Sequence, residues 1–154
     1  MKKILLACNA AISALLSLLG FGCAIVGPDE YGTPSADFII SGRVSSSAGQ
    51  PVKGIAVAMH RLVGMDDGGR DVFSKADSTA TDDGGQYRVL SRGAVPEDQT
   101  YRLTFSDVDG AANGAFRDTT RTVYFIDPTF VGKTGNWHSG EAGKEVNVEL
   151  RPKE

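Results

Sequence analysis

The sequence has few cysteines, few histidines and no basic cluster, and these shortages narrow the classes of function. Its two cysteines, Cys8 and Cys23, lie near the N-terminus, so the remainder of the chain holds neither a disulfide nor a free thiol. The two histidines, His60 and His138, are far apart, and neither a Gly-x-Ser-x-Gly nucleophile motif nor a His-Glu-x-x-His zinc motif occurs. We therefore expect a protein that is not an enzyme.

Positive charge is also scarce. The chain carries 19 acidic and 16 basic residues, a net charge of -3, and losing a leader with Lys2 and Lys3 would make it more acidic. Binding to a phosphate backbone requires clustered Lys and Arg. Nucleic acid is therefore not expected as a partner.

A long apolar run occurs only at the N-terminus, where Lys2 and Lys3 are followed by residues 4–19 and then by Gly22-Cys23. This order is typical of a secretory signal. The Gly22-Cys23 pair resembles the lipobox of bacterial lipoproteins, whose cysteine is acylated. We predict a signal peptide helix over 1–22, lipidation such as palmitate at Cys23, a tether over 23–36 and a folded domain over 37–154. An ordinary cleaved signal and an uncleaved helix are the alternatives.

The rest of the chain lacks helical periodicity and is rich in glycine, with 19 in total. Alternating apolar residues predict strands at 38–44, 55–60, 72–80, 101–105, 123–126 and 146–150, and a further strand after the glycine turn at 81–87. Turn signals at this spacing are typical of sandwiches. We predict an all-β fold, a single seven-stranded antiparallel β-sandwich of transthyretin-like or immunoglobulin-like type behind the signal helix.

Two resemblances extend this interpretation. Gly42-Arg43-Val44, residues 49–57 and residues 81–87 resemble the carboxypeptidase regulatory-like family, which implies a transthyretin-type sandwich and no particular activity. Residues 31–38 and 107–116, together with the tail from Asn136 to Lys153, resemble the radical SAM-associated lipoproteins of Bacteroidetes. That resemblance implies a radical SAM enzyme as maturase or partner. Because Ala24 rather than Asp follows the cysteine, we expect an outer membrane lipoprotein of the cell envelope.

Oxygen-bearing side chains in one glycine-containing segment suggest a cation site. Asp107, Asp109, Asn113 and Asp118 offer the ligands that Ca²⁺ prefers, although the spacing is not that of an EF-hand. The alternative is a turn in which these side chains bond their own backbone. Calcium is the one cofactor that the sequence suggests.

Three further residues are candidate sites. Trp137 lies in a glycine-flanked loop and is a candidate ligand contact, although packing at the end of the core is the favoured interpretation. Ser78 and Thr119 follow aspartates in the pattern used for O-glycosylation of exported Bacteroidetes proteins.

These observations predict an exported, membrane-anchored lipoprotein that serves as a binding or structural protein of the envelope, or as a substrate of a radical SAM enzyme. Its partners would be the membrane, through the lipid at Cys23, and a protein or glycan ligand. The alternative function is a calcium-supported carbohydrate-binding module that uses the Asp107 segment and Trp137.

Overall fold

The computed structural model describes residues 32–110 and 114–153. The chain divides into two compact units, Met1–Gly32 and Thr33–Glu154, and the second unit is the one described below. The predicted signal peptide and Cys23 lie outside the described residues. Within the described part of the chain, no helix is long and apolar enough to cross a membrane.

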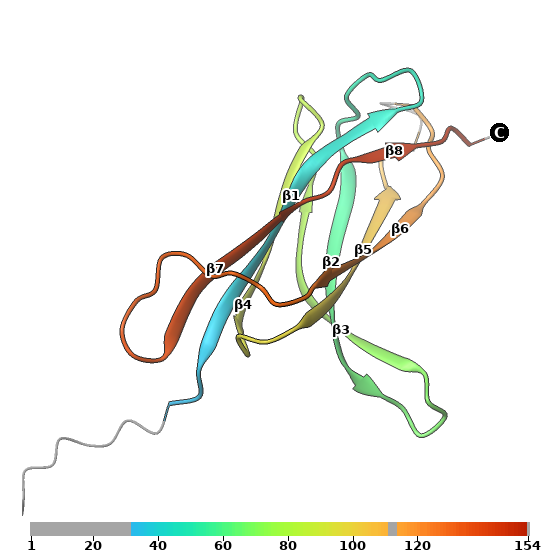
Figure 1. Cartoon of the computed structure of the whole chain (residues 1–154). Coiled ribbons are helices and arrows are strands. Elements are labelled where there is room, and N and C mark those ends of the chain that lie inside the picture. The colour runs from blue at the N-terminus through green and yellow to red at the C-terminus, as the bar shows by residue number, and fades with distance from the viewer. Residues whose placement is uncertain (1–31, 111–113, 154) are drawn as a thin grey trace, which may run out of the picture. The chain divides into compact units, whose positions relative to one another are not determined.

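The described residues form eight strands in two sheets, so the prediction of an all-β sandwich is confirmed (Figure 1). The strands are β1 (Ser35–Ser46), β2 (Ile55–Met65), β3 (Asp71–Ala80), β4 (Gln86–Ala94), β5 (Gln99–Asp107), β6 (Thr119–Phe125), β7 (His138–Glu145) and β8 (Val148–Leu150). β1 begins two residues before the predicted domain boundary at residue 37.

The first sheet is built around β1. β4 pairs with one edge of β1 in antiparallel orientation, and β7 and then β8 pair with its other edge in parallel. The second sheet has the order β3-β2-β5-β6 and is antiparallel throughout. β3 and β4 contact each other across one side of the sandwich, where the Asp77 carboxylate accepts the main-chain N–H of Leu90 at 2.9 Å.

The prediction of seven antiparallel strands is corrected in two respects. The extra strand is β7, which was expected to be loop because its sequence, with Gly140, Ala142 and Gly143, has no alternation of large apolar residues. The tail strand expected over 146–150 is shorter, because Val146 and Asn147 separate β7 from β8 and belong to neither. Both segments pair in parallel with β1, which strand-by-strand patterns do not reveal.

The core lies between the two sheets and is formed by alternate residues of the strands. On β1, Ala36, Phe38, Ile40 and Val44 are fully buried, while the residues between them face outward. The Phe38 ring contacts the rings of Tyr101, Phe125 and Phe130 at centroid distances of 5.0 to 5.7 Å. Burial of this many large side chains supplies the stability that a domain without disulfides needs.

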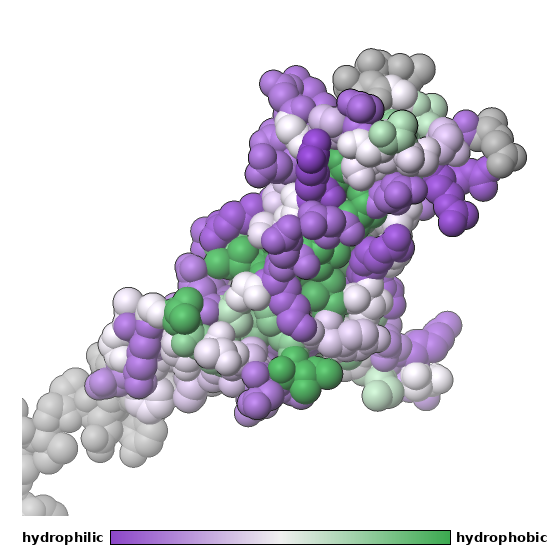
Figure 2. All heavy atoms as spheres, turned by 45° about the horizontal axis from the view of Figure 1, so that its top comes forward, coloured by the Kyte–Doolittle hydropathy of each residue, from purple (hydrophilic) through white to green (hydrophobic). Residues whose placement is uncertain are grey.

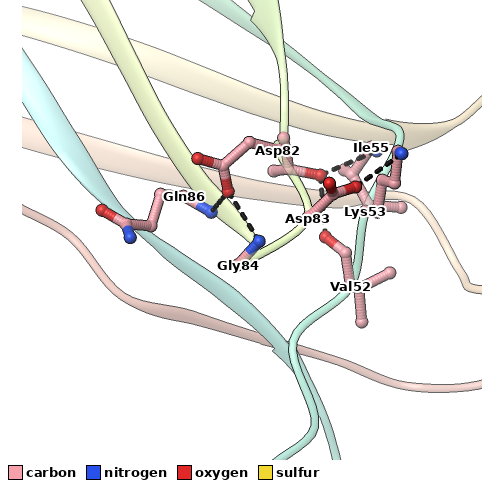
Figure 3. A network of polar contacts seen from close by, with 8 residues as sticks. Val52, Lys53, Ile55, Asp82, Asp83, Gly84 and Gln86 are labelled. Atoms are coloured by element: carbon pink, nitrogen blue, oxygen red, sulfur yellow. Dashed lines mark hydrogen bonds and ion pairs between the residues drawn. The ribbon is translucent and has the colours of Figure 1, made fainter.

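The residues that resemble the carboxypeptidase regulatory-like family form a framework of turns (Figure 3). The buried Thr81 hydroxyl donates to the carbonyl of Val52 at 2.7 Å and accepts the N–H of Ile55 at 3.0 Å. The Asp82 carboxylate accepts the N–H groups of Gly84 and Gln86, at 2.9 and 2.8 Å, and so closes the turn before β4. These motif residues therefore specify how the strands connect.

Candidate functional site at the N-terminal end of the sandwich

The sandwich has two ends that the strand register defines. At the N-terminal end, β1 begins at Ser35, whose N–H bonds the carbonyl of Trp137 at 2.7 Å. At the C-terminal end, β1 finishes at Ser46 opposite Leu150. The two ends are separated by the length of β1, roughly 35 Å at the usual rise of a strand.

Three connections surround the N-terminal end: the β2–β3 hairpin, the turn after β4 and the loop between β6 and β7 (Figure 1). β2 continues past Arg61, the last β2 residue paired with β5, so that the hairpin projects beyond its sheet. The tip is held by Asp66, whose carboxylate accepts the N–H groups of Gly68 and Arg70 and pairs with the Arg70 guanidinium at 2.8 Å. The main-chain bond from Arg70 is the main reason that the pKa of Asp66 is lowered.

Most of the exposed large hydrophobic residues of the described chain lie in the three connections at this end. Figure 2 shows hydrophobic residues standing out among hydrophilic neighbours along the lower part of the molecule. The residues at this end are Val63, Met65, Val72, Val95, Ile126, Val131 and Trp137, with exposures from 38% for Trp137 to 73% for Met65. Val108, 70% exposed, lies instead at the C-terminal end. Exposed hydrophobic residues at one end of a domain make that end a candidate interaction surface.

Two depressions lie beside this surface, and Arg61 lines both. One, of about 440 Å³, lies between β2 and the turn after β4 and is flanked by Val63 and Val95. The other, of about 120 Å³, lies where β3 meets β4. A third, of about 500 Å³, lies on the outer face of β1, where the side chain of Asn147 bonds the main chain of Arg43 and the Glu145 carboxylate.

The buried Tyr101 hydroxyl lies beside the Ser91 side chain, close to the smaller depression at the N-terminal end. The hydroxyl makes no hydrogen bond of standard geometry with any described residue. Burial raises the pKa of Tyr101, and the neighbouring Ser91 and the Arg61 guanidinium partly offset that rise. The hydroxyl therefore stays protonated and able to donate.

The sequence reasoning did not identify Arg61 and Tyr101 as site residues. The predicted strand ended at residue 60, one residue before Arg61. Tyr101 was considered only as a strand residue and, with Tyr87 and Trp137, as an aromatic side chain that either packs in the core or is modified by a radical SAM enzyme. The missing signal is the register, which places Arg61 directly opposite Tyr101 and so turns its side chain toward the inner side of the sheet.

The predicted cation segment lies at the C-terminal end. Asp107 accepts the N–H of Phe116 at 2.7 Å, and Asp118 is 3.4 Å from the hydroxyl of Ser106. Asn113 lies outside the described residues. Among residues 32–110 and 114–153, no group of three or more His, Cys, Asp or Glu side chains is close enough together to hold a metal ion.

Trp137 lies at the end of the sandwich. It is 38% exposed and does not belong to the buried core cluster. The residue lies at the N-terminal end, whereas Asp107 lies at the C-terminal end. The Asp107 segment and Trp137 therefore do not come together in one site.

The two predicted glycosylation residues differ in accessibility. Ser78 lies on the edge strand β3, is exposed, and faces outward beside Ala58. Thr119 opens β6 opposite the buried Phe105 and is half-buried. Ser78 is thus the more accessible acceptor.

Comparison with protein family models and with curated proteins finds no match. Solved structures do resemble the chain. 3-Chlorocatechol 1,2-dioxygenase from Rhodococcus opacus 1CP has a TM-score of 0.51 at 9% identity, with 80% of this chain and 62% of that chain covered. The likeness is one of fold. Hydroxyquinol 1,2-dioxygenase from Pseudomonas putida DLL-E4 has a TM-score of 0.49 at 11% identity, with 97% and 75% covered.

These neighbours correct one expectation from the sequence. The absence of familiar catalytic motifs led us to expect a protein that is not an enzyme, and the comparison contradicts that inference, because the 3-chlorocatechol 1,2-dioxygenase that shares this fold is an enzyme. The sandwich is therefore a scaffold on which catalysis occurs in other proteins. The chain spans 62% of the first of these enzymes, and at 9% identity the likeness extends to the fold alone.

Proposed function

We propose that this protein is an exported lipoprotein of the outer membrane, anchored through acyl chains at Cys23, whose sandwich binds a partner at the envelope through its N-terminal end. The observation that carries the proposal is the position of the exposed hydrophobic side chains. They lie at the end where the chain leaves the predicted tether and enters β1 at Ser35.

The length of the tether supports this arrangement. About a dozen residues separate Cys23 from Ser35, and a fully extended chain of that length spans at most roughly 40 Å. Two or more acyl chains on Cys23 would hold the protein firmly at a bilayer. The hydrophobic N-terminal end would then stay close to the membrane surface and to any protein embedded there, at a high effective concentration.

The same anchoring suits a partner or substrate of a radical SAM enzyme, as the family resemblance implies. Among the aromatic residues that such an enzyme would modify, Tyr87 and Tyr101 are buried, while Trp137 is 38% exposed. Trp137 is therefore the residue of the three that an enzyme would reach in the folded chain.

The first experiment tests the anchor. The intact mass of the protein purified from native membranes is compared with that of a Cys23→Ala variant. We expect the mass of a chain beginning at Cys23 plus acyl groups, and release of the variant from the membrane fraction. A mass matching an unacylated chain, or one that keeps residues 1–22, would contradict the proposal.

A second experiment tests which end faces the partner. The predicted mature chain has no cysteine other than Cys23, so single cysteines introduced as Met65→Cys or Val108→Cys report accessibility at opposite ends. We expect a bulky maleimide to label Met65→Cys poorly in intact envelopes and fully in detergent. Val108→Cys, which is similarly exposed in the free protein, should be labelled in both. Equal labelling of the two sites in envelopes would rule out the N-terminal end as the docking surface.

A second candidate function, glycan binding, is favoured by the exposure of Trp137, because an exposed indole can stack on a sugar ring. Glycan-array binding that is lost in Trp137→Ala would support it. Asp107 lies at the opposite end from Trp137, so calcium bound there would not contact the glycan. It would support such a module only by stabilising the fold. The melting temperature with and without calcium measures that effect.

A further inference from the structure

The small depression where β3 meets β4 is lined by positively charged side chains and hydroxyl groups. Its lining residues are Arg61, Ser74, Lys75, Ala76, Ser91 and Arg92, and no carboxylate is among them. Within the described part of the chain, no ion pair joins Arg61, Lys75 or Arg92 to a carboxylate. Three cationic residues thus line one pocket in a protein whose net charge is negative.

The walls of this pocket are held in place. The Asp77 carboxylate on β3 accepts the N–H of Leu90 on β4, which ties the two strands together next to the pocket. The register of β3 shifts at Ala76, the extra residue of a β-bulge, and bulges turn neighbouring side chains away from the regular pleat. The pocket is therefore a feature of two joined strand edges and not of a free loop.

One lining residue, Ser91, lies beside the hydroxyl of a buried tyrosine, Tyr101. The hydroxyl of Tyr101 is completely buried and has no hydrogen-bond partner of standard geometry, although it lies beside Ser91, which lines the pocket.

We infer that this pocket binds a phosphate group. A volume of about 120 Å³ is well above the roughly 10 to 15 Å³ that one water molecule needs, and it suits a single tetrahedral anion. Guanidinium groups bind phosphate oxygens through paired N–H donors, and three cations match a doubly charged phosphate better than a single carboxylate.

Two nearby carboxylates would repel an anion in the pocket, and each already accepts a hydrogen bond from a main-chain N–H. Asp37 accepts the N–H of Gly93 at 3.0 Å, and Asp77 accepts that of Leu90. The negative charge of Asp37 also contributes to the raised pKa of Tyr101. With three cations against two carboxylates, the local charge remains positive.

The phosphate would come from one of two sources, free phosphate or a lipid headgroup, because the pocket opens near the N-terminal end. The inference does not depend on the lipid anchor or on the proposed docking surface. Phosphate binding by the folded chain in solution is sufficient to test the inference. A negative result for the lipid anchor would therefore leave the phosphate pocket standing, and the reverse is also true.

The test titrates inorganic phosphate into the full-length protein in detergent, with sodium chloride of equal ionic strength as the reference, and follows amide NMR shifts. We expect saturable shifts at Ser91 and Arg92. Arg92→Gln should weaken binding at least about five-fold, equivalent to roughly 1 kcal/mol. Arg88→Gln is the matched control, because Arg88 is an exposed arginine on the same strand outside the pocket, and its affinity should stay within about two-fold.

A second arm separates the two sources. Phosphatidic acid is added to the detergent micelles, and its competition with inorganic phosphate is measured. Competition that Arg92→Gln abolishes assigns the site to a lipid headgroup, and phosphate binding without competition assigns it to a soluble phosphate. Absence of saturable binding of either probe, or equal weakening by Arg92→Gln and Arg88→Gln, would overturn the inference.

Discussion

The hydroxyl of Tyr87 donates a hydrogen bond of 2.7 Å to the main-chain carbonyl of Val146. Tyr87 lies on β4, and Val146 lies between β7 and β8, so the bond links the edge of the first sheet to the break between its two parallel strands. Gly42 lies beside the same carbonyl, because a Cβ at that position would come within 2.0 Å of the Val146 oxygen. Burial raises the pKa of Tyr87 far above its ordinary value, which keeps the hydroxyl a neutral donor.

Removing the hydroxyl tests this bond. Tyr87→Phe should lower the free energy of unfolding by about 1 kcal/mol, because the Val146 carbonyl loses its donor while the ring stays buried. Urea unfolding followed by circular dichroism measures the change. Tyr124→Phe removes an exposed hydroxyl and should be close to neutral, so comparable losses in both variants would count against the assigned role.

A methyl group at Gly42 tests the close approach of Val146. Gly42→Ala should lower the free energy of unfolding by about 2 to 3 kcal/mol or more, because the carbonyl must move to make room. Gly143→Ala, on β7, is the control, since a Cβ at that position would meet no atom within 4 Å, and it should change stability by less than about 0.5 kcal/mol. Thermal unfolding of both variants would decide, and a stable Gly42→Ala protein would contradict the packing described.

The buried Thr81 hydroxyl serves two main-chain groups at once. Thr81→Val keeps the shape of the side chain but leaves the carbonyl of Val52 and the N–H of Ile55 without their partner. We expect a loss of about 2 to 3 kcal/mol in unfolding free energy. Thr122→Val, at an exposed position on β6, should be neutral or slightly stabilising because Val favours strands. A neutral Thr81→Val variant would show that water replaces both bonds.

The lowered pKa of Asp107 predicts that the stability of the fold depends on pH. The N–H of Phe116 is the main cause that lowers the pKa of Asp107 in the folded protein. The stabilisation is therefore present above the unfolded pKa of about 3.9 and is lost as the pH falls through the lower, folded value. Asp107→Asn should lower the melting temperature at pH 7, and its difference from the parent protein should shrink below about pH 4.

The control for this measurement is Asp67→Asn in the exposed hairpin turn, which should leave the melting temperature within about 1 °C throughout. A difference for Asp107→Asn that persists unchanged at acid pH would mean that the carboxylate charge is not what stabilises the Phe116 contact.

Much of the fold was predictable from local patterns. The alternation in residues 38–44, 55–60 and 101–105 identified β1, β2 and β5, because each buries one face against a single core. β7 was not predictable, because its buried side comprises only Gly140 and Ala142. That strand is held by main-chain pairing with β1, to which side-chain hydropathy gives no clue.

The candidate sites were less predictable than the strands. Trp137 and the Asp107 segment were chosen by residue type, and the register places them at opposite ends of the sandwich. Arg61 and Tyr101 carried no motif, and they meet only because β2 pairs with β5 in a register that sets them opposite each other. Residue type indicated which chemistry is available, whereas the pairing decided which groups are neighbours.

The sequence by itself determined the fold class, the turn framework at Thr81 and Asp82, and the prediction of an anchored, exported chain. These follow from short-range causes: a period of two, glycine and aspartate turn chemistry, and an N-terminal apolar run. Only the tertiary structure decided the parallel pairing of β7 and β8 with β1, the gathering of exposed hydrophobic residues at the N-terminal end, and the pocket of Arg61, Lys75 and Arg92. Each of these depends on segments distant in sequence that are brought together by strand register and sheet packing, which local patterns do not encode.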